Sequence, residues 1–142
     1  MVLTEKNSPD AYFLTQEEIG LKALEAWNMG ASEVCIQGGL HPDLPKDYYI
    51  AVLREVKNLV PAMHIHAYSP MEVLYGAERK EMPVDEYLAE LKNAGLGSMP
   101  GTAAEILVDE IRAKICPGKM NTAEWIRVIK AAHGQEYALL AQ

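Results

Sequence analysis

The chain has 142 residues and a mass of 15.7 kDa, enough for one domain with a hydrophobic core and too little for two ordinary ones. Hydrophobic residues make up 49% and charged residues 23%, values typical of a folded protein rather than a disordered one. A formal net charge of −7 argues against a surface for nucleic acid or anionic membranes, since both need clustered positive charge.

The first half of the chain alternates between helix and strand patterns. Thr15 and Glu18 form a capping-box pattern that opens a helix, and Gly30 ends it. A β-type run then closes at Gly38-Gly39, and a second such run follows Pro61. The predicted elements are a helix over 15–30, a strand over 33–37, a helix over 46–59 and a strand over 63–68.

The second half continues this alternation. Ser69 as a cap, Pro70 in the first turn and Glu72 three residues after the cap predict a short helix that fades near Gly76. Gly95 is expected to end the next helix. The predicted elements are helices over 69–76 and 84–94, a strand over 96–99, and helices over 102–114 and 121–134. No element is assigned to the tail, and the core is expected to include Trp27, Tyr87 and Trp125.

Strands that alternate with helices of this length predict right-handed βαβ units around a parallel sheet. Two or three strands are too few to close a barrel. The fold class is therefore α/β, with parallel strands and outer helices that form an arc of a larger barrel, and we expect a single domain over residues 1–142.

The predicted strands carry apolar side chains on one face and polar side chains on the other. Successive side chains of a strand point to opposite faces. We expect Val34, Ile36, Met63, Ile65 and Ala67 to meet the helices. The opposite face then projects Gln37, His64, His66 and Tyr68 into the barrel interior. Unpaired buried polar groups cost roughly 1–3 kcal/mol each, so a polar interior favours a cavity for a polar ligand. The alternative is an exposed face of an antiparallel sheet.

His64 and His66 have the spacing of a metal pair, but no third ligand stands at an obvious distance. We therefore expect no metal site and interpret the two imidazoles as hydrogen-bonding groups. Cys35 and Cys116 lie far apart in the sequence, which favours reduced thiols over a disulfide. No apolar run approaches the roughly 20 residues of a membrane span and no basic-then-apolar leader is present, so we expect a cytoplasmic protein.

Other candidate residues follow the strands. Glu72 stands where barrel enzymes place working residues, although its place in the capping box explains it equally well. Gly38-Gly39 lets the backbone approach a ligand, but it is not a dinucleotide-binding fingerprint. Glu105 is expected to open a helix, where a carboxylate usually serves the helix dipole.

Three long motifs resemble radical S-adenosylmethionine (SAM) enzymes of the FO synthase and menaquinone (futalosine) group. They span residues 30–43, 63–73 and 94–107. Together with Ile115–Lys119 and Trp125, they most resemble the second-subunit family of FO synthase, the tyrosine-using half. The similarity runs from about residue 12 to residue 133, so residues 134–142 form a tail without a match.

This resemblance implies a (βα)6-type partial TIM barrel that binds SAM and a 4Fe–4S cluster. Such enzymes form a 5′-deoxyadenosyl radical that abstracts hydrogen from L-tyrosine. The 4-hydroxybenzyl group of tyrosine is then transferred to 5-amino-6-(D-ribitylamino)uracil, on the route to coenzyme F-420. The other FO synthase subunit is the implied protein partner.

The resemblance also implies roles for individual residues. Gln37, Gly38 and Gly39 would lie against the methionine moiety of SAM. His64, His66 and Glu72 would be the catalytic side chains of the cavity. Substrate contacts would come from Tyr68, Ser69 and Glu105.

The sequence departs from this family at the cluster. The family uses a Cys-x3-Cys-x2-Cys loop, whereas this sequence contains only two cysteines. We therefore expect an internal piece of such an enzyme that forms no radical by itself. An arc with open sheet edges is also expected to be marginally stable or to self-associate. The alternatives are a fragment of a futalosine-pathway enzyme and a binding module without catalytic activity.

Overall fold

Four parallel strands form one sheet in the computed structural model, which describes residues 13–102, 104–135 and 138–140. The strands follow one another across the sheet in the order β1-β2-β3-β4. Their bounds are Glu33–Ile36 (β1), His64–Ala67 (β2), Ser98–Pro100 (β3) and Ala138–Leu140 (β4). The helices are Gln16–Asn28 (α1), Tyr48–Leu59 (α2), Pro70–Arg79 (α3), Val84–Ala94 (α4), Asp109–Ile115 (α5) and Thr122–Gly134 (α6).

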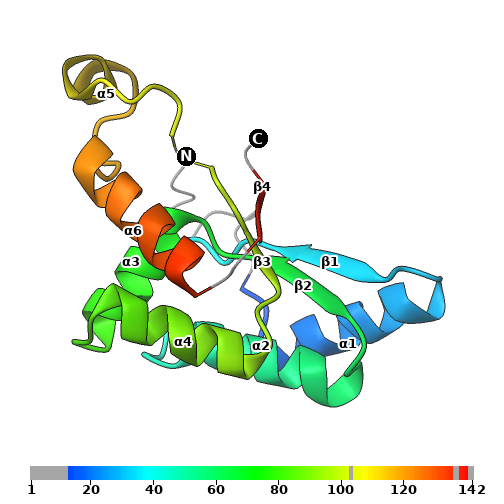
Figure 1. The fold of residues 1–142 in the computed structure, drawn as a ribbon. Coiled ribbons are helices and arrows are strands. Elements are labelled where there is room, and N and C mark those ends of the chain that lie inside the picture. The colour runs from blue at the N-terminus through cyan, green and yellow to red at the C-terminus, as the bar shows by residue number, and fades with distance from the viewer. Residues whose placement is uncertain (1–12, 103, 136–137, 141–142) are drawn as a thin grey trace.

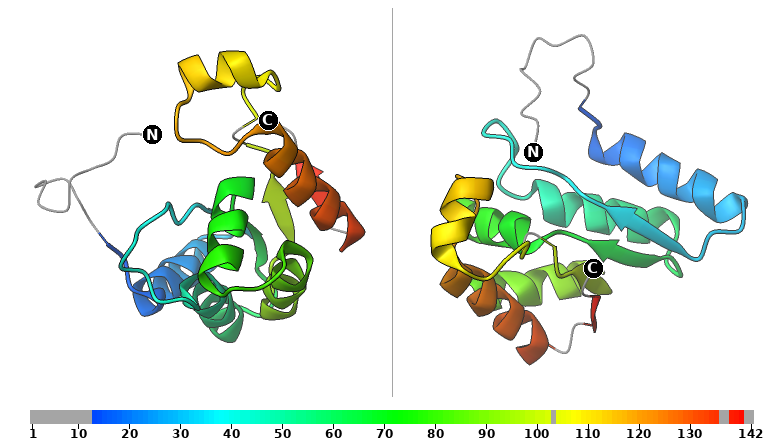
Figure 2. Two further views of the ribbon diagram at one scale, coloured as in Figure 1. Left: turned by 90° about the vertical axis from the view of Figure 1, so that its left-hand side faces the viewer. Right: turned by 90° about the horizontal axis from the view of Figure 1, so that it is seen from above.

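Helices α1, α2 and α4 cover one face of the sheet and curve around it (Figures 1 and 2). Helix α5 stands away from both the sheet and this helical layer (Figure 1). The predicted α/β arc with parallel strands and outer helices is therefore confirmed. None of the described helices is long and apolar enough to cross a membrane.

The core lies between the sheet and this helical layer. Ile65 and Ala67 of β2 face it, as does Met63 just before the strand, and all three are fully buried. Helices α2 and α4 fill the other side with Leu53, Val56, Leu88 and Leu91, which are also fully buried. Tyr87 belongs to this core as predicted, and Trp125 packs against it. Trp27 is 38% exposed, so its predicted core position is wrong.

Helix α3 continues past Gly76, where the sequence predicts its end, to Arg79. Gly76 is a contact residue rather than a stop signal. A Cβ there would lie 2.3 Å from the hydroxyl oxygen of Tyr87, so only glycine lets α3 approach α4 this closely.

Gly76→Ala is expected to destabilise the fold by about 1–3 kcal/mol, because the methyl group overpacks against Tyr87. The clash exceeds the roughly 1 kcal/mol that alanine gains in helix propensity. Tyr87→Phe is the control: the buried Tyr87 hydroxyl has no hydrogen-bond partner among the described residues, so its removal should be neutral or stabilising. Urea denaturation measures both variants, and a Gly76→Ala protein as stable as the parent would contradict the packing shown here.

The helix after β3 starts at Asp109 rather than at residue 102. Buried Arg112 explains the shift, because its guanidinium group donates to the carbonyl oxygens of Ala104, Ile106 and Met120. Carbonyls bound in this way are not available for helical hydrogen bonds, and residues 104–108 are irregular.

The tail contains a fourth strand that the sequence analysis does not predict. β4 pairs in parallel with β3, with Ser98 opposite Ala138 and Pro100 opposite Leu140. Residue 12, where the family resemblance begins, and residues 141–142 of the tail lie outside the described part of the chain.

Candidate functional site

The sheet face opposite the helices carries a row of polar side chains from three neighbouring strands. Register places Cys35 of β1 beside His66 of β2, and His66 beside Ser98 of β3. One position earlier on the same face, Glu33 lies beside His64. Glu33, Cys35 and His64 are exposed, whereas His66 and Ser98 are buried. The predicted orientation of both histidines, away from the apolar core, is thus found.

The hydroxyl group of Ser98 joins the two histidines. Its Oγ lies 2.9 Å from Nε2 of His64 and 2.7 Å from Nδ1 of His66. Nε2 of His64 also lies 3.6 Å from a carboxylate oxygen of Glu33. The His64 ring lies against the backbone of Gly97, where a Cβ would be 2.5 Å from the ring carbon Cε1. His64, His66 and Ser98 thus form one hydrogen-bonded group on this face, and the Glu33 carboxylate lies beside it.

Tyr68 does not face this group, which corrects the sequence prediction. Its φ of +62° breaks the alternation of the strand and turns the side chain toward the helices. The ring packs on Tyr49 with centroids 4.8 Å apart, and the hydroxyl donates to the carbonyl oxygen of Tyr49. Burial raises the pKa of both phenols far above the ordinary tyrosine value, so both remain protonated structural groups.

Glu72 connects the ends of β1 and β2. Its Oε2 accepts hydrogen bonds from the backbone N–H and the hydroxyl of Ser69, which completes the predicted capping box of α3. Its Oε1 accepts from the backbone N–H groups of Gly38 and Gly39, at 2.5 and 2.9 Å. Glu72 as a whole is 4% exposed. Glu72 therefore caps its own helix and also holds the glycine loop after β1.

The glycine loop keeps two polar groups for a ligand. The Gly39 carbonyl accepts from the Tyr49 hydroxyl, and both glycine N–H groups are bound to Glu72. The Gly38 carbonyl and the exposed Gln37 side chain have no hydrogen-bond partner among the residues that the structure describes. The space beside Gly39 is open, since a Cβ there would meet no atom within 4 Å.

Glu105 lies outside this group and does not open a helix, so that prediction is wrong. It has a φ of +42° in the irregular segment before α5. Its carboxylate accepts a hydrogen bond from Lys119 and lies 3.9 Å from a guanidinium nitrogen of Arg112. Glu105 therefore lies with the segment around α5 and not with the polar side chains of the sheet.

A cleft of about 410 Å³ lies at the β1 edge of the sheet rather than over the histidines. Its walls come mainly from the helix side of the sheet, including Ile19 of α1, Val34 and Ile36 of β1, and Tyr48 of α2. Cys35, Gln37 and Gly38 reach its rim.

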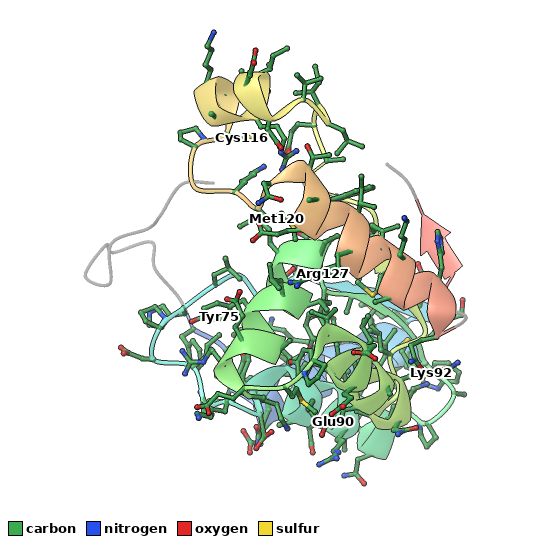
Figure 3. All side chains as sticks on the ribbon, turned by 60° about the vertical axis from the view of Figure 1, so that its left-hand side comes forward. Tyr75, Glu90, Lys92, Cys116, Met120 and Arg127 are labelled. Atoms are coloured by element: carbon green, nitrogen blue, oxygen red, sulfur yellow. The ribbon has the colours of Figure 1, made fainter. Side chains whose placement is uncertain are left out.

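The thiols do not fit a 4Fe–4S cluster. Such a cluster needs three cysteine thiolates when SAM binds its fourth iron, and this sequence has two cysteines. Cys35 lies on β1, while Cys116 lies beside α5, away from the sheet (Figure 3). Within the described ranges, no three histidine, cysteine or acidic side chains gather closely enough to hold a metal ion.

Sequence reasoning identified both histidines, Glu72 and the glycine pair, but not Ser98 as a site residue. Alternation along β3 offered a signal, because Met99 is apolar and its neighbour Ser98 must then face the other way. The second role of Glu72, on the glycine loop, has no local sequence signal.

Comparison with known proteins agrees with the family resemblance of the sequence motifs. The model of the radical SAM superfamily matches residues 3–137. A 5-amino-6-(D-ribitylamino)uracil–L-tyrosine 4-hydroxyphenyl transferase of Archaeoglobus fulgidus is 56% identical over 122 residues, covering 86% of this chain and 36% of the relative. The protein of the same name from Methanopyrus kandleri is 50% identical over 129 residues, covering 91% and 35%. An FO synthase of Streptomyces avermitilis is 52% identical over 128 residues, covering 90% and 15%. The chain thus spans about a third of the two transferases.

Proposed function

Because the chain belongs to the radical SAM superfamily, we propose that it forms part of the barrel of an FO-forming transferase. This enzyme would cleave L-tyrosine and transfer its 4-hydroxybenzyl group to 5-amino-6-(D-ribitylamino)uracil, on the route to coenzyme F-420. The observation that carries the proposal is a sequence identity of at least half, over about nine-tenths of the chain, to two 5-amino-6-(D-ribitylamino)uracil–L-tyrosine 4-hydroxyphenyl transferases. The family assignment also supports a single domain over residues 1–142.

The open sheet face would line the substrate cavity. His64 and His66 would touch the reacting molecules there, as hydrogen-bonding groups that can also hold or move a proton. Their placement supports this role, because two imidazoles and a hydroxyl group lie together on the sheet face opposite the helices. Glu72 would act as a positioning residue for the glycine loop, and Ser69, which is bound to Glu72, would lie beside the substrate.

Gln37, Gly38 and Gly39 would contact SAM. The free carbonyl of Gly38 can accept from an ammonium group, and the Gln37 amide can pair with a carboxylate. When bound, SAM would supply the 5′-deoxyadenosyl group, which becomes a radical when the cluster donates one electron and the bond to sulfur breaks, with methionine as the leaving group. The open space beside Gly39 supports such a contact, because a ligand can approach the backbone there.

The cluster thiolates would come from residues outside this sequence, since two separated cysteines do not fit it. The rest of the enzyme would supply them, and the other FO synthase subunit is the proposed protein partner. Glu105, held by Lys119 near α5, would lie at the rim of the completed cavity.

A segment exchange tests the proposed function. Residues 13–135 replace the matching segment of the Archaeoglobus fulgidus relative, and the chimaera is assayed for tyrosine cleavage and product formation. We expect activity within about tenfold of the parent, which is a change of about 1.4 kcal/mol in the barrier. The parent with this segment deleted serves as the inactive control. A folded chimaera that contains its cluster and yet leaves tyrosine intact would refute the proposal.

A non-catalytic binding module remains the second candidate, because the chain lacks three clustered thiolates. Calorimetry of the isolated chain with SAM in iron-free buffer separates the two. Binding without iron, combined with an inactive chimaera, would favour the module.

A further inference from the structure

The hydrogen bonds of Ser98 link the tautomers of the two histidines. A hydroxyl group has one hydrogen to donate and lone pairs to accept with. Its Oγ is within hydrogen-bond distance of Nε2 of His64 and of Nδ1 of His66. Suppose that both imidazoles are neutral and that Ser98 donates its one hydrogen to one of them. The other ring must then donate a hydrogen to Oγ.

The Glu33 carboxylate favours one direction for the two hydrogen bonds of Ser98. A carboxylate only accepts hydrogen bonds, and its oxygen lies 3.6 Å from the same Nε2 of His64 that faces Ser98. A hydrogen on Nε2 suits both neighbours, because the Glu33 carboxylate can only accept and the Ser98 hydroxyl can accept as well as donate. His64 then donates to Ser98, and the Ser98 hydroxyl donates to Nδ1 of His66. The direction is the same when His64 is positively charged, because its Nε2 is then protonated as well.

We propose that Ser98 is a positioning residue that fixes His66 as the tautomer with its hydrogen on Nε2. This N–H has no hydrogen-bond partner among the described residues and lies on the polar face. His66 would therefore present a donor to an oxygen acceptor of a ligand, a carboxylate or a carbonyl group. The identity of that ligand rests on the proposed function, whereas the tautomer does not.

The buried position of this pair makes the assignment specific. His66 is 4% exposed and Ser98 is 2% exposed, so water competes weakly for their hydrogen bond. His41 offers a half-buried contrast on a loop, where its Nδ1 accepts a hydrogen bond from the Asp43 N–H. The absence of a side chain at Gly97 lets the His64 ring lie against the sheet. The direction of the hydrogen bonds therefore depends on this packing as well as on the charge of Glu33.

Magic-angle-spinning NMR of the ¹⁵N-histidine-labelled chain tests the proposal, because the method does not depend on particle size. His41→Gln and His133→Gln together leave only His64 and His66 visible, and the spectrum is recorded near pH 8, about 1.5 units above the ordinary histidine pKa. We expect one tautomer at His66, with Nδ1 unprotonated. In Ser98→Ala the population ratio of this His66 tautomer to the other should fall about fivefold to tenfold, which corresponds to a free-energy change of about 1–1.4 kcal/mol.

Two further variants separate this role from a general structural one. Ser98→Thr keeps a hydroxyl group and should restore the tautomer, while Glu33→Gln should weaken the preference because an amide both donates and accepts. A hydrogen on Nδ1 of His66 in the parent chain would overturn the proposal, even if Ser98→Ala fails to fold. An unchanged tautomer in folded Ser98→Ala would overturn it too. The NMR sample contains no cofactor or substrate, so its result does not depend on the proposed function. An inactive chimaera would count against the proposed function alone.

Discussion

Anaerobic reconstitution of the isolated chain with iron and sulfide is expected to yield no 4Fe–4S cluster. Three thiolates must surround the cluster at one place, whereas Cys35 on β1 and Cys116 beside α5 stand apart. Rearrangement would have to break the β1–β2 pairing or unfold the α5 region. Iron analysis and electron paramagnetic resonance of the reduced sample measure the outcome.

The Archaeoglobus fulgidus relative and the chimaera are the positive controls for this experiment, and both should bind about four iron atoms. Cys35→Ser should leave the result for the isolated chain unchanged. A cluster signal of about one spin per chain, in a sample that remains monomeric, would contradict the assignment of the thiolates to another part of the enzyme.

Replacement of Glu72 is expected to release the glycine loop as well as to weaken α3. Its carboxylate binds four donors on two segments, the N–H groups of Gly38 and Gly39 and two groups of Ser69. Glu72→Ala should lower the free energy of unfolding by about 2–3 kcal/mol. The corresponding fall in the melting temperature is about 6–12 °C. Differential scanning calorimetry measures both.

Glu18 and Glu124 provide matched controls, because each occupies the same capping-box position at the start of α1 or α6. Among the described residues, neither accepts a hydrogen bond from a second segment, as Glu72 does from the glycine loop. Glu18→Gln and Glu124→Gln should therefore cost less than about 1 kcal/mol, and Glu72→Gln clearly more. In the chimaera, Glu72→Gln should also weaken SAM binding, which the two controls should leave unchanged. Equal effects of all three substitutions would show that Glu72 acts only as a helix cap.

Local signals predicted the helix starts well. Thr15 and Ser69 each cap a helix with a glutamate three residues later, and both predicted capping boxes are present. The structure adds a third capping box at Asn121 and Glu124. Such motifs depend only on neighbours in the sequence. The two faces of β2 were likewise predictable from alternation, which holds for residues 64–67 and fails at Tyr68, where the backbone adopts a positive φ.

Features that depend on distant partners were not predictable. The late start of α5 follows from the bonds of Arg112 to carbonyls on both sides of the helix. The link between Ser98 and both histidines requires the register of β2 and β3. Gly76 resembles a helix stop until Tyr87 of α4 is placed against it.

The sequential strand order has a consequence for how the chain folds during synthesis. Each strand pairs with the next one, roughly 30 to 40 residues further along the chain, and never with a more distant strand of the described sheet. A nascent polypeptide can therefore add one strand–helix unit at a time as it leaves the ribosome. Ribosome-stalled chains that are long enough to bring β2 out of the exit tunnel should already show protected amides in β1, before β3 has emerged.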